Sequence, residues 1–447
     1  MPPVSEILFM TSAAPAKSPF STKEKRPPLG VGFMISILRE HGHHVHFIDR
    51  YLDPDKIDPF SYVRDYNIDF VGIYSNTICF KDTLFLIDGL HRMRMSGDWS
   101  GKILVGGPHA SVVPDTIPDV VDVVVIGEGD KTILDIVEGM DLGDVVHSDR
   151  LTQTQLNKLP FQPWDIFTRS PYDFTCPWMD ATPTFTLNTS RGCPFNCSFC
   201  SVNSIFGFKY TRFGADRIVS EIKHLVEKYG AKGIYFREDN FTVDIKRIKR
   251  FCGLLQKKNI NITWACETRV DNLDRDIIKM MSDAGCKAFY LGVESGSQKI
   301  LDIVNKKIDI EQVENVINWG KKFGIRSYCS LITGVPGETF KDYKMTMNLM
   351  KRLKPYSYSF NVFVGIPYSD LYRKCLDENL YEYIDDVGLM YLPGFDVKTR
   401  YFYGMESTEF VDYDFDVERR SEYDRDLLRN IPKMKLSGVI KHILRRK

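Results

Sequence analysis

The sequence predicts an α/β protein: a doubly wound parallel sheet, then a partial (β/α)6 barrel, then a small C-terminal domain. Short apolar runs alternate with longer amphipathic stretches through the first 150 residues and again through residues 185–365, which is the pattern of successive βα units. Residues 151–184 between the two series are rich in proline and aromatic residues without a steady period. We therefore expect domains at 1–150 and 185–365, a linker at 151–184 and a C-terminal segment at 366–447.

The first domain is predicted from five strand-like runs, at 6–10, 44–49, 68–75, 102–107 and 122–130, with helical stretches at 29–42, 83–94 and 131–140. Doubly wound sheets bind ligands at the carboxyl ends of their strands. A long stretch without a G-x-G-x-x-G pattern separates the first run from its helix, which disfavours the usual dinucleotide binding. The polar and glycine residues that follow the runs form one candidate ligand-binding rim: Thr11, Ser12, Ser75, Asn76, Thr77, Gly106, Gly107, His109, Gly127 and Glu128.

The second domain is predicted from six strand-like runs, at 185–192, 232–239, 262–269, 287–295, 326–334 and 356–364. Helical stretches follow the first five, at 215–230, 245–258, 275–285, 310–324 and 340–355. Right-handed crossovers curl such units into a barrel or most of one, and active residues then lie at the strand carboxyl ends. We expect the polar residues after these strands to face one mouth.

Composition excludes several classes of function. Lys plus Arg and Asp plus Glu both number 59, and no basic stripe with interleaved aromatics precedes the last fifteen residues, so nucleic acid is not an expected partner. The N-terminus lacks the pattern of a secretion signal, and no run reaches the ~18 apolar residues of a spanning helix. Seven of the ten cysteines are scattered singly, several within apolar runs, which indicates buried thiols rather than a disulfide framework. We expect a cytoplasmic protein.

Three cysteines stand apart from this pattern. Cys193, Cys197 and Cys200 lie in "SRGCPFNCSFCSV", directly after the first strand of the second domain. A cubane iron–sulfur cluster takes four thiolates and a zinc ion takes four ligands, so one ligand is missing. A structural zinc site is the alternative to a cluster. Cys176 is a possible fourth ligand, but its neighbours indicate packing at the domain boundary.

This motif, Cys-x3-Cys-x2-Cys with Phe199 before the last cysteine, resembles the signature of the radical S-adenosylmethionine (radical SAM) enzymes. The stretches "GVESGSQ" and "TGVPGET" are similar to that family's contacts with S-adenosylmethionine, and residues 27–130 resemble a Rossmann-like cobalamin-binding domain. The resemblance to the cobalamin-dependent subclass implies that the three cysteines hold a [4Fe-4S] cluster in a TIM-like barrel. It also implies that S-adenosylmethionine fills the fourth position and is cleaved to a 5′-deoxyadenosyl radical, with electrons from a flavodoxin or ferredoxin.

The resemblance also assigns expected roles at the other strand ends. Glu238 and Asp239 are placed to accept hydrogen bonds from the ribose or the methionine amino group, or else to cap the following helix. Arg269 is placed to bind the methionine carboxylate or a substrate anion, unless it forms a surface salt bridge. Further cofactor contacts are expected from Glu294, whose buried carboxylate needs a partner, and from Ser295, Gly334 and Glu338.

For the first domain the resemblance implies cobalamin bound without histidine ligation. The Asp-x-His-x-x-Gly motif that supplies an axial ligand in another class of cobalamin proteins is missing after the first strand. His109 is expected beside the nucleotide tail or its phosphate, or else it is a turn residue near a strand end. Asn76 and Thr77 are expected to face the lower side of the corrin.

The leading interpretation is a cobalamin-dependent methyltransferase acting on an unactivated carbon of a natural-product or lipid-like substrate. The alternative is a radical cyclase, epimerase or dehydratase in which cobalamin is absent or transfers no methyl group. Methylthiolation would need three further cysteines in the N-terminal domain, residues 1–150, where only Cys79 is found. A non-enzymatic scaffold would leave the polar strand ends unexplained.

The C-terminal tail, residues 433–447, predicts a basic amphipathic helix. Such a helix either packs its apolar stripe on the barrel or lies on an anionic membrane surface and gives the enzyme a peripheral membrane association. The aromatic segment 391–407 before it is expected to help to line a substrate pocket.

Overall fold

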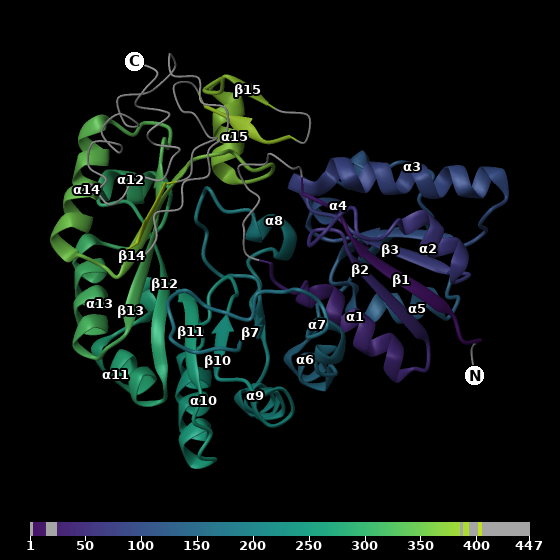
Figure 1. Cartoon of the computed structure of the whole chain (residues 1–447). Coiled ribbons are helices and arrows are strands. Elements are labelled where there is room, and N and C mark those ends of the chain that lie inside the picture. Colours follow the sequence, from purple (N-terminus) through teal and green to yellow (C-terminus); the bar gives the residue numbers. More distant parts are fainter. Residues whose placement is uncertain (1–2, 15–24, 385–387, 393–400, 405–447) are drawn as a thin grey trace, which may run out of the picture. The chain divides into compact units, whose positions relative to one another are not determined.

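The computed structural model describes residues 3–14, 25–384, 388–392 and 401–404 (Figure 1). The chain forms two compact units. The first comprises the described residues up to 174 together with 186–188 and 204–217, and the second comprises 175–185, 189–203 and the described residues from 218 onward. The predicted basic tail at 433–447 and most of the aromatic segment 391–407 lie outside the described residues.

The first unit contains a six-stranded sheet in the order β2-β1-β3-β4-β5-β6. All five pairings are parallel, so the carboxyl ends of the strands lie along one edge. The order reverses between β1 and β3, and such a switch point is where doubly wound sheets open a crevice for ligands. The strands are β1 (Glu6–Thr11), β2 (His44–Asp49), β3 (Phe70–Tyr74), β4 (Lys102–Gly106), β5 (Val123–Gly127) and β6 (Val145–Ser148).

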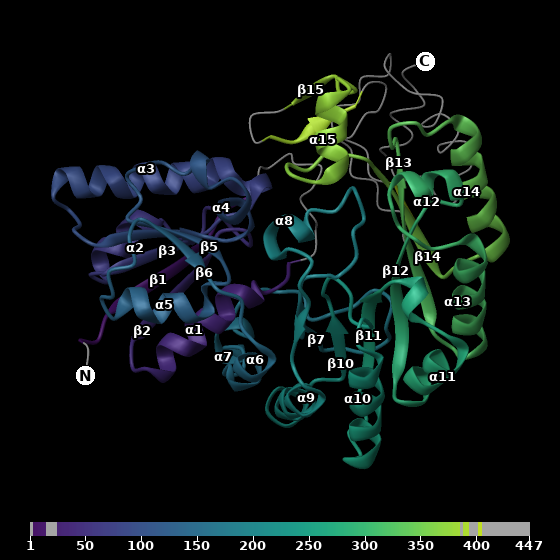
Figure 2. The same ribbon diagram turned by 180° about the vertical axis from the view of Figure 1, so that it is seen from behind.

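Helices cover both faces of this sheet. Helices α1 (Leu29–Glu40) and α5 (Gly129–Val137) pack together on one face, and α2 (Pro59–Asp65) and α3 (Phe80–Ser96) lie on the other (Figure 2). Buried aliphatic and aromatic side chains from α1, α5 and the strands form the core beneath α1. Shorter elements of this unit are η1 (Thr77–Cys79), α4 (Pro108–Val112), η2 (Pro114–Thr116), α6 (Gln153–Lys158), α7 (Trp164–Phe167) and β9 (Thr211–Arg212).

Five of these strands match the five runs predicted from the sequence, and β6 is an addition. Only Val146 of its four residues is buried, whereas Val145 is 51% exposed. An edge strand pairs on one side and buries little apolar surface, so it leaves almost no hydrophobic signal in the sequence.

The second unit is built on a sheet in the order β7-β10-β11-β12-β13-β14-β17. The pairings from β10 to β14 are parallel, and β17 pairs antiparallel with β14. The six predicted strands of the barrel are therefore present, followed by one antiparallel strand that was not predicted. The strands are β7 (Thr184–Leu187), β10 (Gly233–Phe236), β11 (Thr263–Thr268), β12 (Cys286–Glu294), β13 (Arg326–Thr333), β14 (Ser357–Val362) and β17 (Tyr401–Gly404).

Helices connect these strands and cover one face of the sheet (Figure 1). All five predicted helices form, and each follows the strand expected. Trp264, Phe289 and Cys329, which point toward the helices, are fully buried, whereas Glu267, Tyr290 and Ser330 on the opposite face are partly exposed. The helices are α9 (Ala215–Tyr229), α10 (Ile245–Lys257), α11 (Arg275–Asp283), α12 (Gln298–Ile303), α13 (Ile310–Lys322), α14 (Phe340–Leu353) and α15 (Asp370–Asp377).

The amino end of the barrel interior is closed by residues that precede β7. Cys176 and Met179 pack with Tyr235 and with small residues of β11 and β12. The Trp178 and Tyr328 rings pack at a tilt with their centroids 5.0 Å apart. Cys176 thus lies in an apolar core, in agreement with the packing expected from its neighbours. None of the described helices has the length and hydrophobicity needed to span a bilayer.

Candidate functional site

The three motif cysteines occupy one loop between β8 (Ser190–Arg191) and α8 (Val202–Phe206). Each of their sulfurs receives an N–H hydrogen bond. The backbone N–H of Phe195 donates to Cys193, that of Val202 donates to Cys200, and the Arg269 guanidinium donates to Cys197 over 3.1 Å. N–H donors stabilise negative charge on sulfur, so the loop is arranged for thiolate ligands.

The protonation of Cys193 and Cys200 depends on burial. Burial raises the pKa of the Cys193 thiol and raises that of Cys200 to about 12, and the neighbouring Asp239 and Cys197 add to both shifts. None of the ten cysteines, all of which lie in described segments, forms a disulfide, and the seven outside the loop are all buried. A bound cluster would supply the positive charge that keeps such sulfurs ionised, because metal coordination deprotonates a thiol.

The donor set fits an iron–sulfur cluster. In a cubane each thiolate binds a different iron, and within the described part of the chain no three His, Cys, Asp or Glu side chains converge on a single metal position. Ser190 Oγ and Asn203 Oδ1 flank the loop, and both are buried without a hydrogen-bond partner among the described residues. The loop therefore offers three sulfurs and two adjacent polar atoms to a bound group.

Hydrogen bonds to the turn after α12 fix the backbone of the cysteine loop. The Ser198 N–H donates to the Val304 carbonyl over 3.0 Å, and the Asn305 side-chain amide donates to the Asn196 carbonyl over 2.5 Å. Phe199 packs against the apolar cluster that contains Val304. The position of the three sulfurs is thus set by contacts distant in sequence.

Glu238 and Asp239 hold the segment that leads into the loop. The Glu238 carboxylate accepts from the N–H groups of Thr189 and Ser190, and Arg247 lies 3.4 Å from it. Asp239 accepts from the Gly192 N–H over 3.0 Å. The alternative that these acids cap a helix is wrong, because Asp244 is the N-cap of α10.

Arg269 is buried, with 5% of its surface exposed, so the alternative of a surface salt bridge is wrong. It forms a bidentate pair with Asp271, with distances of 2.9 Å and 2.8 Å. It also donates to the Lys306 carbonyl and stacks 4.0 Å from the centre of the Phe195 ring. A contact of Arg269 with a carboxylate of a cofactor or substrate remains a prediction.

The buried carboxylate of Glu294 is paired with a buried lysine, Lys306. The Lys306 ammonium lies 2.7 Å from Glu294 Oε1, and both side chains are at most 7% exposed. Glu294 ends β12 at a break in register and has a φ of 64°, a conformation that non-glycine residues rarely adopt. Lys306 makes no other side-chain hydrogen bond within the described structure, so two of its three N–H donors remain available.

The remaining predicted residues of this unit lie near β12 and β13. The Ser295 hydroxyl contacts Thr346 of α14 at 3.1 Å, within the packing between elements. The Gly334 N–H donates to the Glu338 carboxylate over 2.5 Å, which closes a tight turn after β13. Burial raises the pKa of Glu338 to about 7.

In the first unit, the predicted rim residues all lie at or directly after the carboxyl ends of β1, β3, β4 and β5. Ser12 and Ser75 both contact the Thr83 hydroxyl, at 2.7 Å and 3.0 Å, so a chain of buried hydroxyls lies at the β1/β3 switch point. The Thr11 hydroxyl donates to Asp49, and the Asn76 side chain caps η1. The chain folds its polar strand ends into one edge, as predicted.

The glycines of the rim permit a close approach of the backbone. Gly107 has a φ of 103°, and a Cβ there would lie 2.6 Å from the Ser75 carbonyl oxygen. Gly127 has a φ of 94°, and its N–H donates to the Ser111 hydroxyl oxygen. Gly106 is the last residue of β4. Gly107 and Gly127 require glycine for local geometry whether or not a ligand is bound, whereas a Cβ at Gly106 would meet its neighbours only at ordinary contact distance.

His109 is engaged on both sides of its ring. Its Nδ1 lies 3.2 Å from the Thr77 hydroxyl, its Nε2 lies 2.9 Å from the Thr116 hydroxyl, and the ring stacks on Phe80. Burial lowers the pKa of His109 to about 4, so the ring is neutral at pH 7. Both ring nitrogens of His109 are thus engaged with protein hydroxyls, and its place beside the nucleotide tail of cobalamin remains a prediction.

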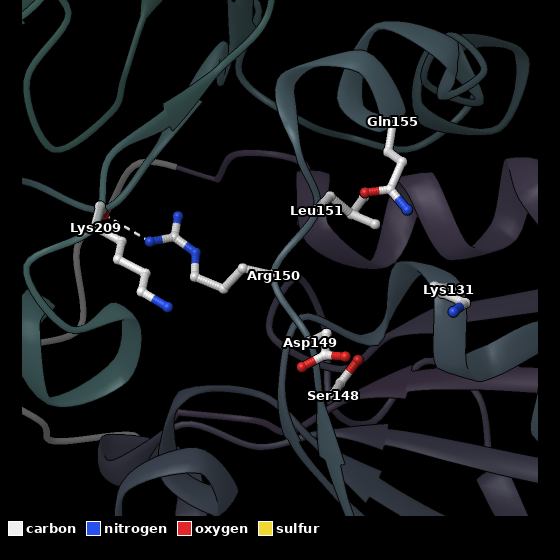
Figure 3. A pocket seen from close by; sticks show the side chains of 7 residues that line it. All are labelled: Lys131, Ser148, Asp149, Arg150, Leu151, Gln155 and Lys209. Atoms are coloured by element: carbon white, nitrogen blue, oxygen red, sulfur yellow. Dashed lines mark hydrogen bonds between the residues drawn. The ribbon is translucent and has the colours of Figure 1, made fainter.

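A polar pocket of about 430 Å³ lies beyond β6 in the first unit (Figure 3). Arg150, at its centre, is turned toward the Lys209 carbonyl, to which it donates over 2.6 Å. Its Nε donates to Glu128 over 3.0 Å, and Glu128 also accepts from the Leu151 N–H. The predicted rim residue Glu128 is therefore held by two protein partners. The lining residues are Lys131, Ser148, Asp149, Arg150, Leu151, Gln155 and Lys209.

Sequence reasoning missed Arg150 and Lys306 near these sites, and it assigned no role to Glu267 at the end of the third barrel strand. Burial raises the pKa of Glu267, on the partly exposed face of the second sheet, to about 7, and the Tyr235 hydroxyl donates to it over 2.5 Å. The available signal was strand alternation, because Glu267 is an acid at an inward-facing position of a strand. Arg150 and Lys306 lie in irregular segments and gave no periodic signal.

Two family models match the chain. The B12 binding domain matches residues 21–137, and the radical SAM superfamily matches residues 187–350. The chain is 28% identical to an uncharacterized methyltransferase of Pyrococcus horikoshii over 79% of both chains. It is 23% identical to a cytidylyl-2-hydroxyethylphosphonate methyltransferase of Streptomyces wedmorensis over 82% of both chains. It is 27% identical to an anaerobic magnesium-protoporphyrin IX monomethyl ester cyclase of Rubrivivax gelatinosus, over 62% of this chain and 53% of the cyclase.

Solved structures share the fold. The chain superposes on OxsB, a cobalamin-dependent S-adenosylmethionine radical enzyme with aqua-cobalamin bound, with a TM-score of 0.66 and 19% identity over 84% of this chain and 56% of OxsB. It superposes on the methyltransferase TsrM from Kitasatospora setae, with cobalamin and a [4Fe-4S] cluster bound, with a TM-score of 0.66 and 14% identity over 86% of this chain and 80% of TsrM. At these identities the superpositions establish the fold alone.

Proposed function

The chain belongs to the cobalamin-dependent radical SAM enzymes, and from this premise we propose that it transfers a methyl group to an unactivated carbon of a small molecule. Its cofactors are a [4Fe-4S] cluster, S-adenosylmethionine and cobalamin. The observation that carries the proposal is the cysteine loop, in which each of three sulfurs receives one N–H donor. The same chain provides a polar rim at a sheet switch point, where a methyl carrier would bind.

The cluster and S-adenosylmethionine supply a radical by one-electron cleavage of the sulfonium, and cobalamin supplies a methyl group. The protein's task is to hold and separate these groups. Cys193, Cys197 and Cys200 would bind the cluster. Lys306 would direct its unused N–H donors at the methionine carboxylate, while Glu294 keeps the ammonium in place. Glu238 and Asp239 would act by fixing the entry to the loop.

In the first unit, we propose that cobalamin lies over the carboxyl ends of β1 and β3. Ser12, Ser75, Asn76 and Thr77 would face it. Because both nitrogens of His109 contact threonine hydroxyls, the lower face of the corrin would be free of histidine. Such a rim can accept cobalamin whose dimethylbenzimidazole has left the cobalt.

Similarity to a cyclase supports a second candidate function. In that case the protein would be a radical cyclase, epimerase or dehydratase, and cobalamin would transfer no methyl group. The partly exposed acid Glu267, with a pKa near 7, can take or give a proton in either case. The two candidates therefore differ in whether the methyl group of S-adenosylmethionine is transferred to cobalamin.

Labelling distinguishes them. The enzyme, purified without oxygen and supplied with hydroxocobalamin, a chemical reductant and S-adenosylmethionine carrying a deuterated methyl group, is analysed for bound corrinoid by mass spectrometry. A labelled methyl group on the bound cobalt supports the methyltransferase. 5′-Deoxyadenosine formed without any labelled corrinoid favours the second candidate. Reduced flavodoxin and ferredoxin would then be compared as electron donors.

The cysteine assignment has a matched control. Cys197→Ala should abolish the cluster absorbance and the cleavage of S-adenosylmethionine, because two thiolates do not hold the cubane. Cys252→Ala, which alters a buried thiol of α10, should retain both. Tightly bound zinc without labile sulfide in the wild-type protein would overturn the cluster assignment.

A further inference from the structure

Arg269 is buried, and its side chain contacts the cysteine loop at two residues. Its guanidinium donates to Cys197 Sγ over 3.1 Å and stacks on Phe195, two residues earlier in the same loop. A second branch donates to the carbonyl of Lys306, in the turn that holds the loop backbone. One side chain therefore joins the loop, one of its sulfurs and the turn that supports it.

The bidentate pair with Asp271 fixes the direction of this guanidinium. Nε and Nη2 contact the two carboxylate oxygens at 2.9 Å and 2.8 Å, which leaves Nη1 directed at Cys197. The planar fork of arginine permits this division, and a lysine ammonium lacks it. Asp271 also cancels most of the positive charge of Arg269, since the two groups are within salt-bridge distance.

We propose that Arg269 is a positioning residue that sets the reduction potential of the cluster through Cys197, and that Asp271 moderates its effect. A hydrogen bond to a ligand sulfur and a nearby positive charge both favour the reduced, more negative state of an iron–sulfur cluster. The inference rests on the presence of the cluster and is independent of methyl transfer.

Charge and hydrogen bonding predict shifts of opposite sign for the two partners. Arg269→Gln removes the cation and should lower the midpoint potential of the cluster. Asp271→Asn leaves the cation uncompensated, while its amide oxygen can still accept from Arg269, and should raise the potential. Arg269→Lys keeps the charge but loses the fork, so its potential should lie between those of the wild type and Arg269→Gln.

The test is a redox titration of the reconstituted full chain, followed by electron paramagnetic resonance without S-adenosylmethionine, with iron and sulfide measured for each variant. Arg326→Gln is the control, because Arg326 begins β13 at the amino end of the sheet, whereas Arg269 follows the carboxyl end of β11. The midpoint potential of the cluster in Arg326→Gln should equal that in the wild type.

Opposite shifts for Arg269→Gln and Asp271→Asn support the proposal. Shifts of the same sign, or unchanged potentials with full iron content, overturn it. If Arg269→Gln does not retain iron, Asp271→Asn decides: a raised potential supports the proposal and an unchanged one refutes it. A wild-type chain that takes up no cluster would refute the family cofactor itself, which is a separate outcome.

Discussion

Loss of the Lys306 ammonium should destabilise the second unit strongly. Lys306→Met keeps most of the side-chain volume but leaves Glu294 buried without its partner. Both side chains are at most 7% exposed and the ions are 2.7 Å apart. Breaking such a buried pair on one side costs about 3–5 kcal/mol, because the remaining charge is no longer compensated.

The double variant isolates the pair. Glu294→Gln combined with Lys306→Met removes both charges, so its loss of stability should be much smaller than the sum of the two single losses. At roughly 2–4 °C per kcal/mol for a unit of this size, Lys306→Met should lower the midpoint of the second thermal transition by about 6–20 °C. Scanning calorimetry of the full chain measures each unit's transition. Losses that add across the cycle would refute the coupling of Glu294 and Lys306.

Three further outcomes are expected. Burial holds the pKa of His109 at about 4, below its value of 6.5 in the unfolded chain. The contribution of His109 to the stability of the first unit should therefore be complete above pH 6.5 and fall as the pH drops toward 4. Calorimetry at several pH values should show that His109→Gln flattens this dependence. Gly107→Ala should lower the thermal unfolding midpoint of the first unit and weaken cobalamin binding more than Gly42→Ala does. Both glycines have a positive φ, but of the two only Gly107 has atoms within 4 Å of an added Cβ. Arg150→Gln should lower the first transition by leaving buried Glu128 without its cation, and an unchanged midpoint would contradict this.

The strands and helices were predictable where burial leaves a period in the sequence. All five barrel helices have an apolar stripe on one side, and β10–β13 alternate or are continuously apolar. β6 was missed because it buries one residue. The alternation rule also separates Trp264 from Glu267 correctly, so the exposed face of the second sheet could be read from the sequence.

The positions of the site residues along the chain were predictable, but their hydrogen-bond and ion-pair partners were not. Cys193, Glu238 and Arg269 all lie at strand ends, as expected, because chain order places them there. The contact of Arg269 with Cys197 joins residues 72 apart, and Lys306 reaches Glu294 from an irregular turn. Such pairs depend on how loops close in space, about which local pattern says nothing.

Substitutions on the two faces of the second sheet should affect folding differently. Trp264, Phe289 and Cys329 are sealed beneath helices, where a change of volume opens or overfills the core. Glu267, Tyr290 and Ser330 alternate with them on the partly exposed face, where packing constrains a side chain less. Inward positions nearer the amino ends of the strands, such as Ala265 and Ala288, are buried in the core that Cys176 and Met179 close. An engineer who seeks a new substrate should therefore randomise the inward positions near the carboxyl ends of β11, β12 and β13 and hold the sealed positions fixed.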